Sequence, residues 1–417
     1  MVFERGMFKF QGMKIGLLNE TKNPIDNRVA LSPIQAKELM ERFPDSTIVV
    51  QRSDIRVFSD DEYRNAGINV SDDLSDCDVL FGIKEVKSST LIPSKHYIYF
   101  GHIAKKQAYN RPLLLAMMGK GITYTDYEYM VGADGKRLCA FGWWAGVVGV
   151  YYTLQGYGLR TGEYALPKPD LKFQMKDLKK QLLSTDLPKK KILVTGNGRV
   201  SQGAQFILDA IGATRLSKEE FCSNAPISQL SYTVACHEDL VSRTDNEPYS
   251  HDHFINHPEL YKSNFMTWGR YADMLVTGHF WAPNQPVYLD EENLRDPDLR
   301  IKMIGDVTCD IKGSIKSTIR SSTHDDPFYD YNPNTGSEEK AFSGENNITV
   351  MAVDTCPNAL AHDSSKYFGD MLIQHVFIPL LKGEADQSQV IRGATILDKG
   401  QLTERFSYLE AFAKGEE

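Results

Sequence analysis

Residues 191–211 combine a short apolar run, a glycine-rich turn and a helical pattern, and this order limits the fold more than any other feature of the chain. The run 192–194 is typical of a buried parallel strand, and the helical pattern follows the turn directly. Small residues stand at four positions in the turn and first helical residues: Gly196, Gly198, Ser201 and Gly203. Glycines let a backbone approach phosphate oxygens, and a helix N-terminus supplies N–H groups and the positive end of a dipole. The pattern therefore favours a dinucleotide-binding loop, although an ordinary strand-to-helix turn has the same letters.

Short apolar runs alternate with helical patterns along most of the chain, which predicts mostly parallel sheets. The expected strands are 14–18, 46–51, 79–83, 97–100, 121–126, 213–216, 232–236, 274–277, 303–306 and 349–353. A chain of 417 residues is long for one core. We therefore expect an α/β fold with two Rossmann-like domains whose parallel sheets flank a central cleft. Residues 1–142, completed by 358–417, form the expected substrate domain, and 143–357 form the dinucleotide-binding domain.

Three further segments have a distinctive composition. Residues 138–159 lack charged side chains but contain five glycines, so we expect a buried helix at the domain junction rather than a membrane span. Residues 167–188 are rich in Lys, Asp and Pro and predict a solvated excursion. Residues 321–347 are polar and predict a long surface loop. A last helical pattern runs over 366–381.

Composition and charge limit the class of partner. A net charge of -8 argues against nucleic acid or an anionic membrane, which leaves small-molecule partners. The six cysteines form no C-x-x-C pair, which suits the reduced thiols of a cytoplasmic protein and no zinc site. We interpret His251, His253 and His257 as part of a solvated loop rather than a metal site. The first residues lack the apolar region of a signal peptide, and we expect residues before Met13 to add nothing to the fold.

Two candidate acid–base groups directly follow predicted strands. Lys84 follows 79–83, and His102 follows 97–100. Ligands of α/β proteins bind at the carboxyl ends of parallel strands, and a Lys and a His in one cleft can move protons near neutral pH. A solvated lysine and a hydrogen-bonding histidine are the alternative from the same letters. Arg28, on a turn before a helix, could bind a substrate carboxylate or lie on the surface.

Acidic residues also stand at strand ends in the second half of the chain. Asp306 and Asp310 bracket the end of 303–306, and Asp354 follows 349–353. Each could border a ligand at the carboxyl edge of the sheet, or could be a simple loop acid or turn cap.

Taken together, these pieces resemble one family. Arg28 in R-V-A-L-S-P, Lys84 in G-I-K-E and His102 in F-G-H resemble the N-terminal half of the alanine dehydrogenase and transhydrogenase superfamily. Within it, the chain is most similar to the branch of lysine–2-oxoglutarate reductase, equivalently lysine-forming saccharopine dehydrogenase. The stretches that carry the closer likeness are D-Y-E-Y-M from 126, A-F-G-W-W-A-G from 140, D-V-T-C-D from 306, F-G-D-M-L from 368, and the glycine loop with serine at its sixth position.

The resemblance implies that the ε-amine of lysine condenses with 2-oxoglutarate and that a reduced nicotinamide delivers hydride to the imine, giving saccharopine. Carried over by motif, His102 and Lys84 would be the acid–base pair, and Arg28 would bind a substrate carboxylate. Glu128 would tune the lysine or hold the substrate amine. The implied cofactor contacts are Gly196, Gly198, Arg199, Ser201 and Gly203 at the pyrophosphate, with Asp310 and Asp354 bordering the nicotinamide.

The choice between NAD and NADP depends on one strand end. NAD-linked members have an acidic residue at the end of the second nucleotide-domain strand, where it binds the ribose hydroxyls. Here the predicted strand 213–216 is followed by Ser217 and Lys218, with two glutamates beyond. This favours NADP, while the direction of the reaction and the oligomeric state stay open.

Two other functions compete with this one. The first is an alanine dehydrogenase-like amino-acid dehydrogenase, against which the F-G-W-W-A-G stretch and the long insertion 219–265 stand. The second is a catalytically silent nucleotide-binding module. The presence of Lys84, His102 and Arg28 together argues against that module.

Overall fold

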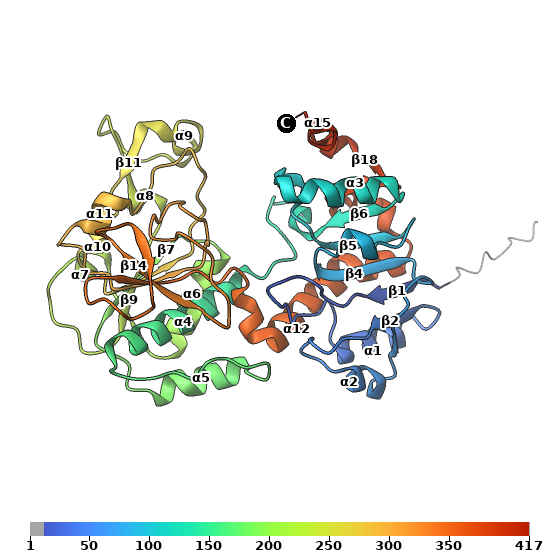
Figure 1. Ribbon diagram of the computed structural model, residues 1–417, viewed down its shortest axis with the longest axis horizontal. Coiled ribbons are helices and arrows are strands. Elements are labelled where there is room, and N and C mark those ends of the chain that lie inside the picture. The colour runs from blue at the N-terminus through green and yellow to red at the C-terminus, as the bar shows by residue number, and fades with distance from the viewer. Residues whose placement is uncertain (1–11, 417) are drawn as a thin grey trace, which may run out of the picture. The chain divides into compact units, whose positions relative to one another are not determined.

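The computed structural model describes residues 12–416, and within them the chain divides into two compact units (Figure 1). The first unit comprises the residues up to Ala140 together with those from Ala361 onward, and the second comprises Phe141–Leu360. The sequence places the two boundaries after 142 and after 357. The expectation for the residues before Met13 falls almost entirely outside the described residues.

The first unit contains an eight-stranded sheet with the order β18-β17-β6-β5-β4-β1-β2-β3. Its strands are β1 (Lys14–Leu17), β2 (Thr47–Gln51), β3 (Asn69–Ser71), β4 (Val79–Lys84), β5 (His96–Phe100), β6 (Thr123–Asp126), β17 (Thr395–Asp398) and β18 (Gln401–Leu402). The six strands from β6 to β3 are parallel, and β17 joins β6 in the antiparallel direction. The helices are α1 (Pro33–Arg42), α2 (Asp60–Asn65), α3 (Arg111–Gly119), α12 (Ala361–Leu372), α13 (Ile378–Leu381), α14 (Gln389–Ala394) and α15 (Glu410–Lys414).

The second unit contains another eight-stranded sheet, with the order β15-β14-β16-β13-β12-β7-β9-β8. Its strands are β7 (Lys191–Thr195), β8 (Thr214–Arg215), β9 (Ser231–Ala235), β12 (Met274–Thr277), β13 (Met303–Asp306), β14 (Phe328–Asn332), β15 (Ser337–Glu339) and β16 (Ile348–Met351); β10 (Val241–Arg243) and β11 (Tyr261–Ser263) pair separately. The strands from β16 to β8 are parallel. The helices are α4 (Gly142–Thr161), α5 (Met175–Ser184), α6 (Arg199–Ala210), α7 (Lys218–Phe221), α8 (His237–Leu240), α9 (His251–Asn256), α10 (Met266–Gly269) and α11 (Glu291–Arg295). The predicted α/β class with two Rossmann-like, mostly parallel sheets is confirmed.

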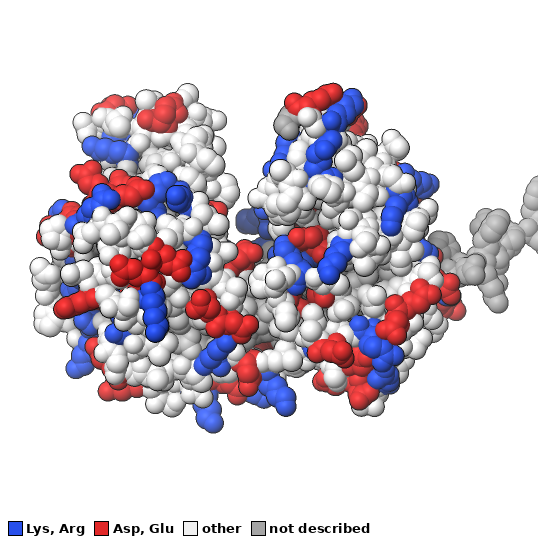
Figure 2. All heavy atoms as spheres, in the orientation of Figure 1, with Lys and Arg blue, Asp and Glu red and all other residues white. Residues whose placement is uncertain are grey.

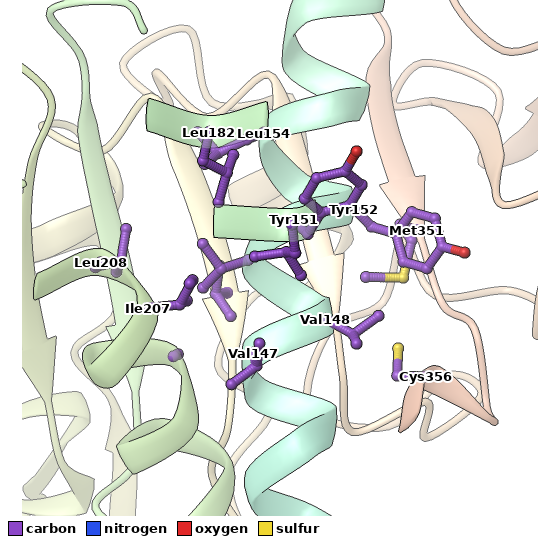
Figure 3. Packing of buried hydrophobic residues seen from close by; sticks show 14 of the residues in the cluster. Val147, Val148, Tyr151, Tyr152, Leu154, Leu182, Ile207, Leu208, Met351 and Cys356 are labelled. Atoms are coloured by element: carbon purple, nitrogen blue, oxygen red, sulfur yellow. The ribbon is translucent and has the colours of Figure 1, made fainter. Parts of the chain in front are cut away.

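The uncharged segment predicted as a buried helix is α4, which packs in the core of the second unit (Figure 3). Its glycines allow close contact with α6. A Cβ added at Gly146 would lie 1.8 Å from the carbonyl oxygen of Val200, and one added at Gly203 would lie 1.9 Å from that of Trp143. The glycine content therefore serves helix packing. Among the described residues, no helix is both long and apolar enough to cross a bilayer.

Two segments expected to be irregular contain regular elements. Residues 167–188 include α5, because Leu178 and Leu182 form a buried stripe on an otherwise charged helix. Residues 321–347 include β14 and β15, and the aromatic side chains of β14 are buried. The three histidines expected on a loop lie in or just after α9, which buries Phe254. The sequence did not predict these elements because each buries only a few large side chains among polar residues.

Charged side chains of both signs are interspersed on the face drawn in Figure 2, with no broad area of one sign. This mixture fits the modest net charge of -8. It gives no support to a polyanionic partner on that face.

Candidate functional site

The predicted dinucleotide loop is a tight turn between β7 and α6. Gly196 has a φ of +85°, and a Cβ there would lie 2.7 Å from the carbonyl oxygen of Gly278. Gly198 is the N-cap of α6; no side chain caps the helix there, and a Cβ at Gly198 would meet no atom within 4 Å. The turn thus combines one position that only glycine can occupy with an open helix N-terminus. This cradle fits a pyrophosphate, which would bind the N–H groups of the first turn of α6.

The shifted third glycine has a physical explanation. Ser201 is fully buried, and its Oγ accepts a hydrogen bond from Nε2 of Gln205 at 3.1 Å. The close contact with a neighbouring element occurs two residues later, where Gly203 faces the backbone of Trp143. Arg199 is the first residue of α6. Position 201 therefore accepts a side chain, whereas position 203 does not.

A buried histidine forms hydrogen bonds with residues next to the glycine turn. His279 Nδ1 lies 2.6 Å from Oγ1 of Thr195, and its Nε2 lies 2.8 Å from Oγ of Ser314. Thr195 Oγ1 also accepts the backbone N–H of Gly278 at 3.2 Å. Burial lowers the pKa of His279 to about 3, so the ring is neutral. The sequence analysis missed this residue, although it follows a predicted strand as Lys84 and His102 do.

The acidic residues of the second sheet occupy different environments. Asp306 is buried and accepts hydrogen bonds from Oγ1 of Thr277 at 2.6 Å, from the N–H of Thr308 at 3.1 Å, and from Oγ1 of Thr318. Asp310 and Asp354 are exposed and follow the neighbouring parallel strands β13 and β16. Asp306 thus holds the loops at this edge together, whereas the carboxylates of Asp310 and Asp354 are exposed to solvent.

Ser217 and Lys218 are engaged in local structure. Ser217 caps α7: its Oγ accepts the N–H of Glu220 at 3.2 Å, and the Glu220 carboxylate accepts the N–H of Ser217 at 2.8 Å. Lys218 Nζ forms an ion pair with Asp239. The predicted strand 213–216 shortens to β8, which lies at the sheet edge, and β9 is the neighbour of β7. The strand before Ser217 is thus the second of this sheet in the chain, but β9 lies between it and β7.

In the first unit, the structure brings His102 and Glu128 together. His102 follows β5 with a φ of +54°, and its Nδ1 lies 3.0 Å from Oε2 of Glu128. The other carboxylate oxygen of Glu128 contacts Lys105 Nζ at 3.1 Å and Arg137 Nη2 at 3.0 Å. Burial opposes ionisation, but the hydrogen bond from His102 and the two cations lower the pKa of Glu128 to about 2. An ionised carboxylate only accepts, so His102 Nδ1 carries the proton and Nε2 is left to exchange one.

Asp126 fixes the backbone beneath this pair. Its carboxylate accepts hydrogen bonds from the N–H of Gly101 at 3.2 Å, the N–H of His102 at 3.1 Å and the N–H of Glu128 at 2.9 Å. Tyr124 Oη donates to it at 2.8 Å. Asp126 is fully buried, and burial raises its pKa above the ordinary value. It is a positioning residue that the sequence analysis did not single out, although it begins the D-Y-E-Y-M stretch.

Lys84 and Arg28 belong to a second group with two acids. The Arg28 guanidinium binds Asp26 through Nε at 2.9 Å and through Nη2 at 2.5 Å, and both side chains are buried. Glu20 accepts the backbone N–H groups of Ile83 at 2.6 Å and Lys84 at 2.9 Å.

The charges of this second group are coupled. Burial and the charge of Asp26 raise the pKa of Glu20 to about 8. Burial opposes the ionisation of Asp26, but the charge and hydrogen bonds of Arg28, together with the charge of Lys84, lower its pKa. The guanidinium edge expected to bind substrate thus already holds an internal carboxylate.

These two groups share one edge of the first sheet. Lys84 ends β4 and pairs in register with Phe100, the last residue of β5, two residues before His102. Glu128 was expected to tune the lysine or hold the substrate amine; its carboxylate contacts His102, Lys105 and Arg137. Among residues 12–416, no three His, Cys, Asp or Glu side chains are arranged to hold a metal ion.

Comparison with known proteins shows which proteins this chain is similar to. Residues 16–148 match the family model of the alanine dehydrogenase/PNT N-terminal domain. Alpha-aminoadipic semialdehyde synthase of Arabidopsis thaliana is 30% identical over 96% of this chain and 41% of its own length, and that of Bos taurus is 28% identical over 97% and 48%. The saccharopine dehydrogenase (NAD(+), L-lysine-forming) of Candida glabrata is 24% identical over 86% of the chain and 89% of its own length. The chain thus spans less than half the length of the two synthases.

Solved structures agree on the fold. An L-alanine dehydrogenase covers 96% of the chain with a TM-score of 0.66 and 15% identity, and all of that protein is covered. A transhydrogenase from Sinorhizobium meliloti covers 94% with a TM-score of 0.60 and 16% identity, again over its whole length. At these identities the likeness concerns the fold alone. Residues 16–148 thus resemble the alanine dehydrogenase/PNT N-terminal domain, and the likeness to the saccharopine dehydrogenases and alpha-aminoadipic semialdehyde synthases predicted from the motifs of the chain is confirmed.

Proposed function

We propose that this chain is an NAD(P)-dependent oxidoreductase of the amino-acid dehydrogenase type that interconverts L-lysine plus 2-oxoglutarate and saccharopine. The observation that carries the proposal is the His102–Glu128 pair, at 3.0 Å, next to the strand end that carries Lys84. The glycine cradle between β7 and α6 supports a nicotinamide dinucleotide as the redox partner. The names of the relatives support the substrate class.

In this proposal, side chains of the first unit transfer the protons that the reaction requires. The ε-amine of lysine attacks the keto carbon of 2-oxoglutarate, and the carbinolamine must gain a proton on its oxygen before water leaves. His102, with both ring nitrogens protonated, donates it from Nε2, because Nδ1 is held by the ionised Glu128. A bound reduced nicotinamide would supply the hydride, which converts the protonated imine into the secondary amine of saccharopine. The reverse reaction needs the same groups in the opposite protonation states.

Lys84 takes the second proton-transfer role. It ends β4 above the N–H groups held by Glu20, and its positive charge faces the buried Asp26. Two acids lie in the same group as this lysine: the pKa of Glu20 is raised, and the pKa of Asp26 is lowered. We assign Lys84, in its uncharged form, to accept the proton that the attacking amine loses, and the charge that Lys84 then carries is stabilised by the buried Asp26.

The alternative activity is that of an alanine dehydrogenase, which one observation favours: residues 16–148 match the family model of the alanine dehydrogenase/PNT N-terminal domain. Oxidation of NADH and NADPH by the purified chain should be measured with lysine plus 2-oxoglutarate and, separately, with pyruvate plus ammonia. Turnover with the first pair supports the proposal, and turnover with only the second pair replaces it. Nucleotide binding without turnover in either mixture would assign the chain to the silent nucleotide-binding modules.

A further inference from the structure

The order of strands in the second sheet decides which residues meet the adenosine ribose of a bound dinucleotide. β9 lies between β7 and β8, although β8 precedes it in the chain. All five residues of β7 pair with β9, from Lys191 opposite Ser231 to Thr195 opposite Ala235. In parallel nucleotide-binding sheets, the ribose is bound at the carboxyl end of the strand beside the first one. That strand is β9 here.

The hydrogen bonds at the glycine turn support this assignment. The N–H of Gly196 donates to the carbonyl oxygen of Ala235 at 2.8 Å, so the end of β9 touches the turn directly. β8 pairs only with Ser231 and Tyr232, the first two residues of β9, and the N–H of Leu216 donates to Tyr232 at 2.8 Å. The residue after Ala235 is therefore beside the turn, whereas Ser217 is one strand farther along the sheet.

We infer that Cys236, the residue that directly follows β9, determines whether the chain binds NAD or NADP. This inference rests on the nicotinamide-linked function proposed above. NAD-linked sheets place a carboxylate at this strand end, and a carboxylate would repel the 2′-phosphate of NADP. This chain has a thiol there instead, so the strand end admits the phosphate. Ser217, at the end of β8, has no part in the choice.

The charges around Cys236 agree with this role. The nearest carboxylate, Asp239, is occupied on both oxygens: it accepts the N–H of Cys236 at 2.8 Å and is paired with Lys218. Lys218 and Arg215 act on the thiol as nearby positive charges, against the negative charges of Asp239 and Glu238. Burial raises the pKa of Cys236, so the thiol is uncharged at neutral pH. Two cations and two carboxylates thus lie near the thiol, and the side chain at the strand end itself adds no negative charge.

The test compares carboxylates placed at the two strand ends. Cys236→Asp and Ser217→Asp each put an acid at a helix N-cap, a position that Asp favours, so both variants keep their local fold. Kd values for NADPH and NADH are measured by nucleotide fluorescence without substrates. Cys236→Asp should raise the NADPH Kd relative to the NADH Kd by about tenfold or more, because only NADPH carries the extra anion. Ser217→Asp and the neutral Cys236→Ser should leave that ratio within about twofold.

A second variant keeps the test decisive if Cys236→Asp does not fold. Cys236→Arg should shift the ratio of Kd values in the opposite direction, towards NADPH. An unchanged ratio in both Cys236 variants, or a change in Ser217→Asp of equal size, overturns the inference. Nucleotide binding with the expected ratios but no turnover of lysine plus 2-oxoglutarate would refute the proposed function and leave the inference standing; absence of nucleotide binding in the parent chain would refute both.

Discussion

His102 Nδ1 and Glu128 Oε2 lie 3.0 Å apart across the ends of two neighbouring parallel strands, β5 and β6. Two cations, Lys105 and Arg137, contact the other oxygen of Glu128. The carboxylate thus has positive or proton-donating neighbours on both oxygens, and it holds the imidazole in one tautomer. Proton transfer at Nε2 of His102 depends on this orientation.

Replacing the orienting carboxylate should impair turnover without affecting the nucleotide. Glu128→Gln keeps the size of the side chain but removes the charge that fixes the His102 ring, so we expect kcat to fall by about 10- to 100-fold, as loss of an orienting carboxylate does at other histidine sites. The Kd for NAD(P)H should not change. Asp134→Asn, at an exposed acid paired with Lys136, is the control. Equal kcat values for the parent and Glu128→Gln would remove Glu128 from the mechanism.

The acid–base pair can be tested by a double-mutant cycle. His102→Gln and Lys84→Met should each lower kcat by about 100- to 10,000-fold, with nucleotide binding intact. If the two side chains act in one proton relay, the double mutant loses less than the product of the two single effects. Steady-state kinetics with saturating lysine and 2-oxoglutarate measures all three. Strictly multiplicative losses would show that the two groups act in separate steps.

The buried Glu20 predicts a pH dependence of stability. Its pKa rises from 4.5 to about 8 in the folded chain, so between these values the folded state binds a proton that the unfolded state has lost. The free energy of unfolding should therefore fall as the pH rises through this window. Glu20→Gln removes the titrating group and should flatten the decline. Urea unfolding at a series of pH values measures both curves, and parallel curves for parent and variant would contradict the assignment.

Glu20 is distinguishable from its neighbour by the direction of the effect. The pKa of Asp26 is lowered, so its contribution to stability is present above its ordinary value of 3.8 and is lost as the pH falls further. Loss of stability in acid thus reports on Asp26 and Arg28, whereas loss between 4.5 and about 8 reports on Glu20.

Alanine substitutions at two glycines of the α6 region should have different effects, one on stability and the other on nucleotide binding. Gly203→Ala forces a Cβ against the carbonyl oxygen of Trp143 and should destabilise the second unit by about 1–3 kcal/mol. Gly198→Ala meets no atom within 4 Å, so stability should change by about 1 kcal/mol or less, while the Kd for NAD(P)H rises because the methyl group lies in the cradle. Thermal unfolding and nucleotide titration of both variants separate packing from binding.

The sequence predicted the parts of the fold that depend on local patterns. The β7 strand, the glycine turn, the buried α4 and most central strands follow from periodicity and glycine placement. The order of β8 and β9 in the sheet does not follow from such patterns, because it depends on how the connections between the strands pack in the folded chain. β14 and α5 were missed because their few buried side chains stand among polar neighbours.

The candidate site was predicted to a similar extent. His102, Lys84 and Glu128 stand out in the sequence because they follow strands or lie in recognisable motifs. Glu20 and Asp126 are ordinary acids in the sequence, and only the folded chain shows that they accept the backbone N–H groups of Lys84 and His102. Arg28 stands out by its motif, but its pairing with Asp26, two residues away, is visible only in the folded chain.

The contact between α4 and α6 also limits which substitutions this chain can accept during evolution. The atoms that obstruct a side chain at Gly146 and Gly203 are backbone carbonyl oxygens, which no substitution elsewhere can shrink. A larger residue at either position therefore has no second-site suppressor among side-chain changes, and relief requires the helices to move apart. Selection for suppressors in a library of Gly146 or Gly203 variants should return revertants to glycine rather than compensating pairs.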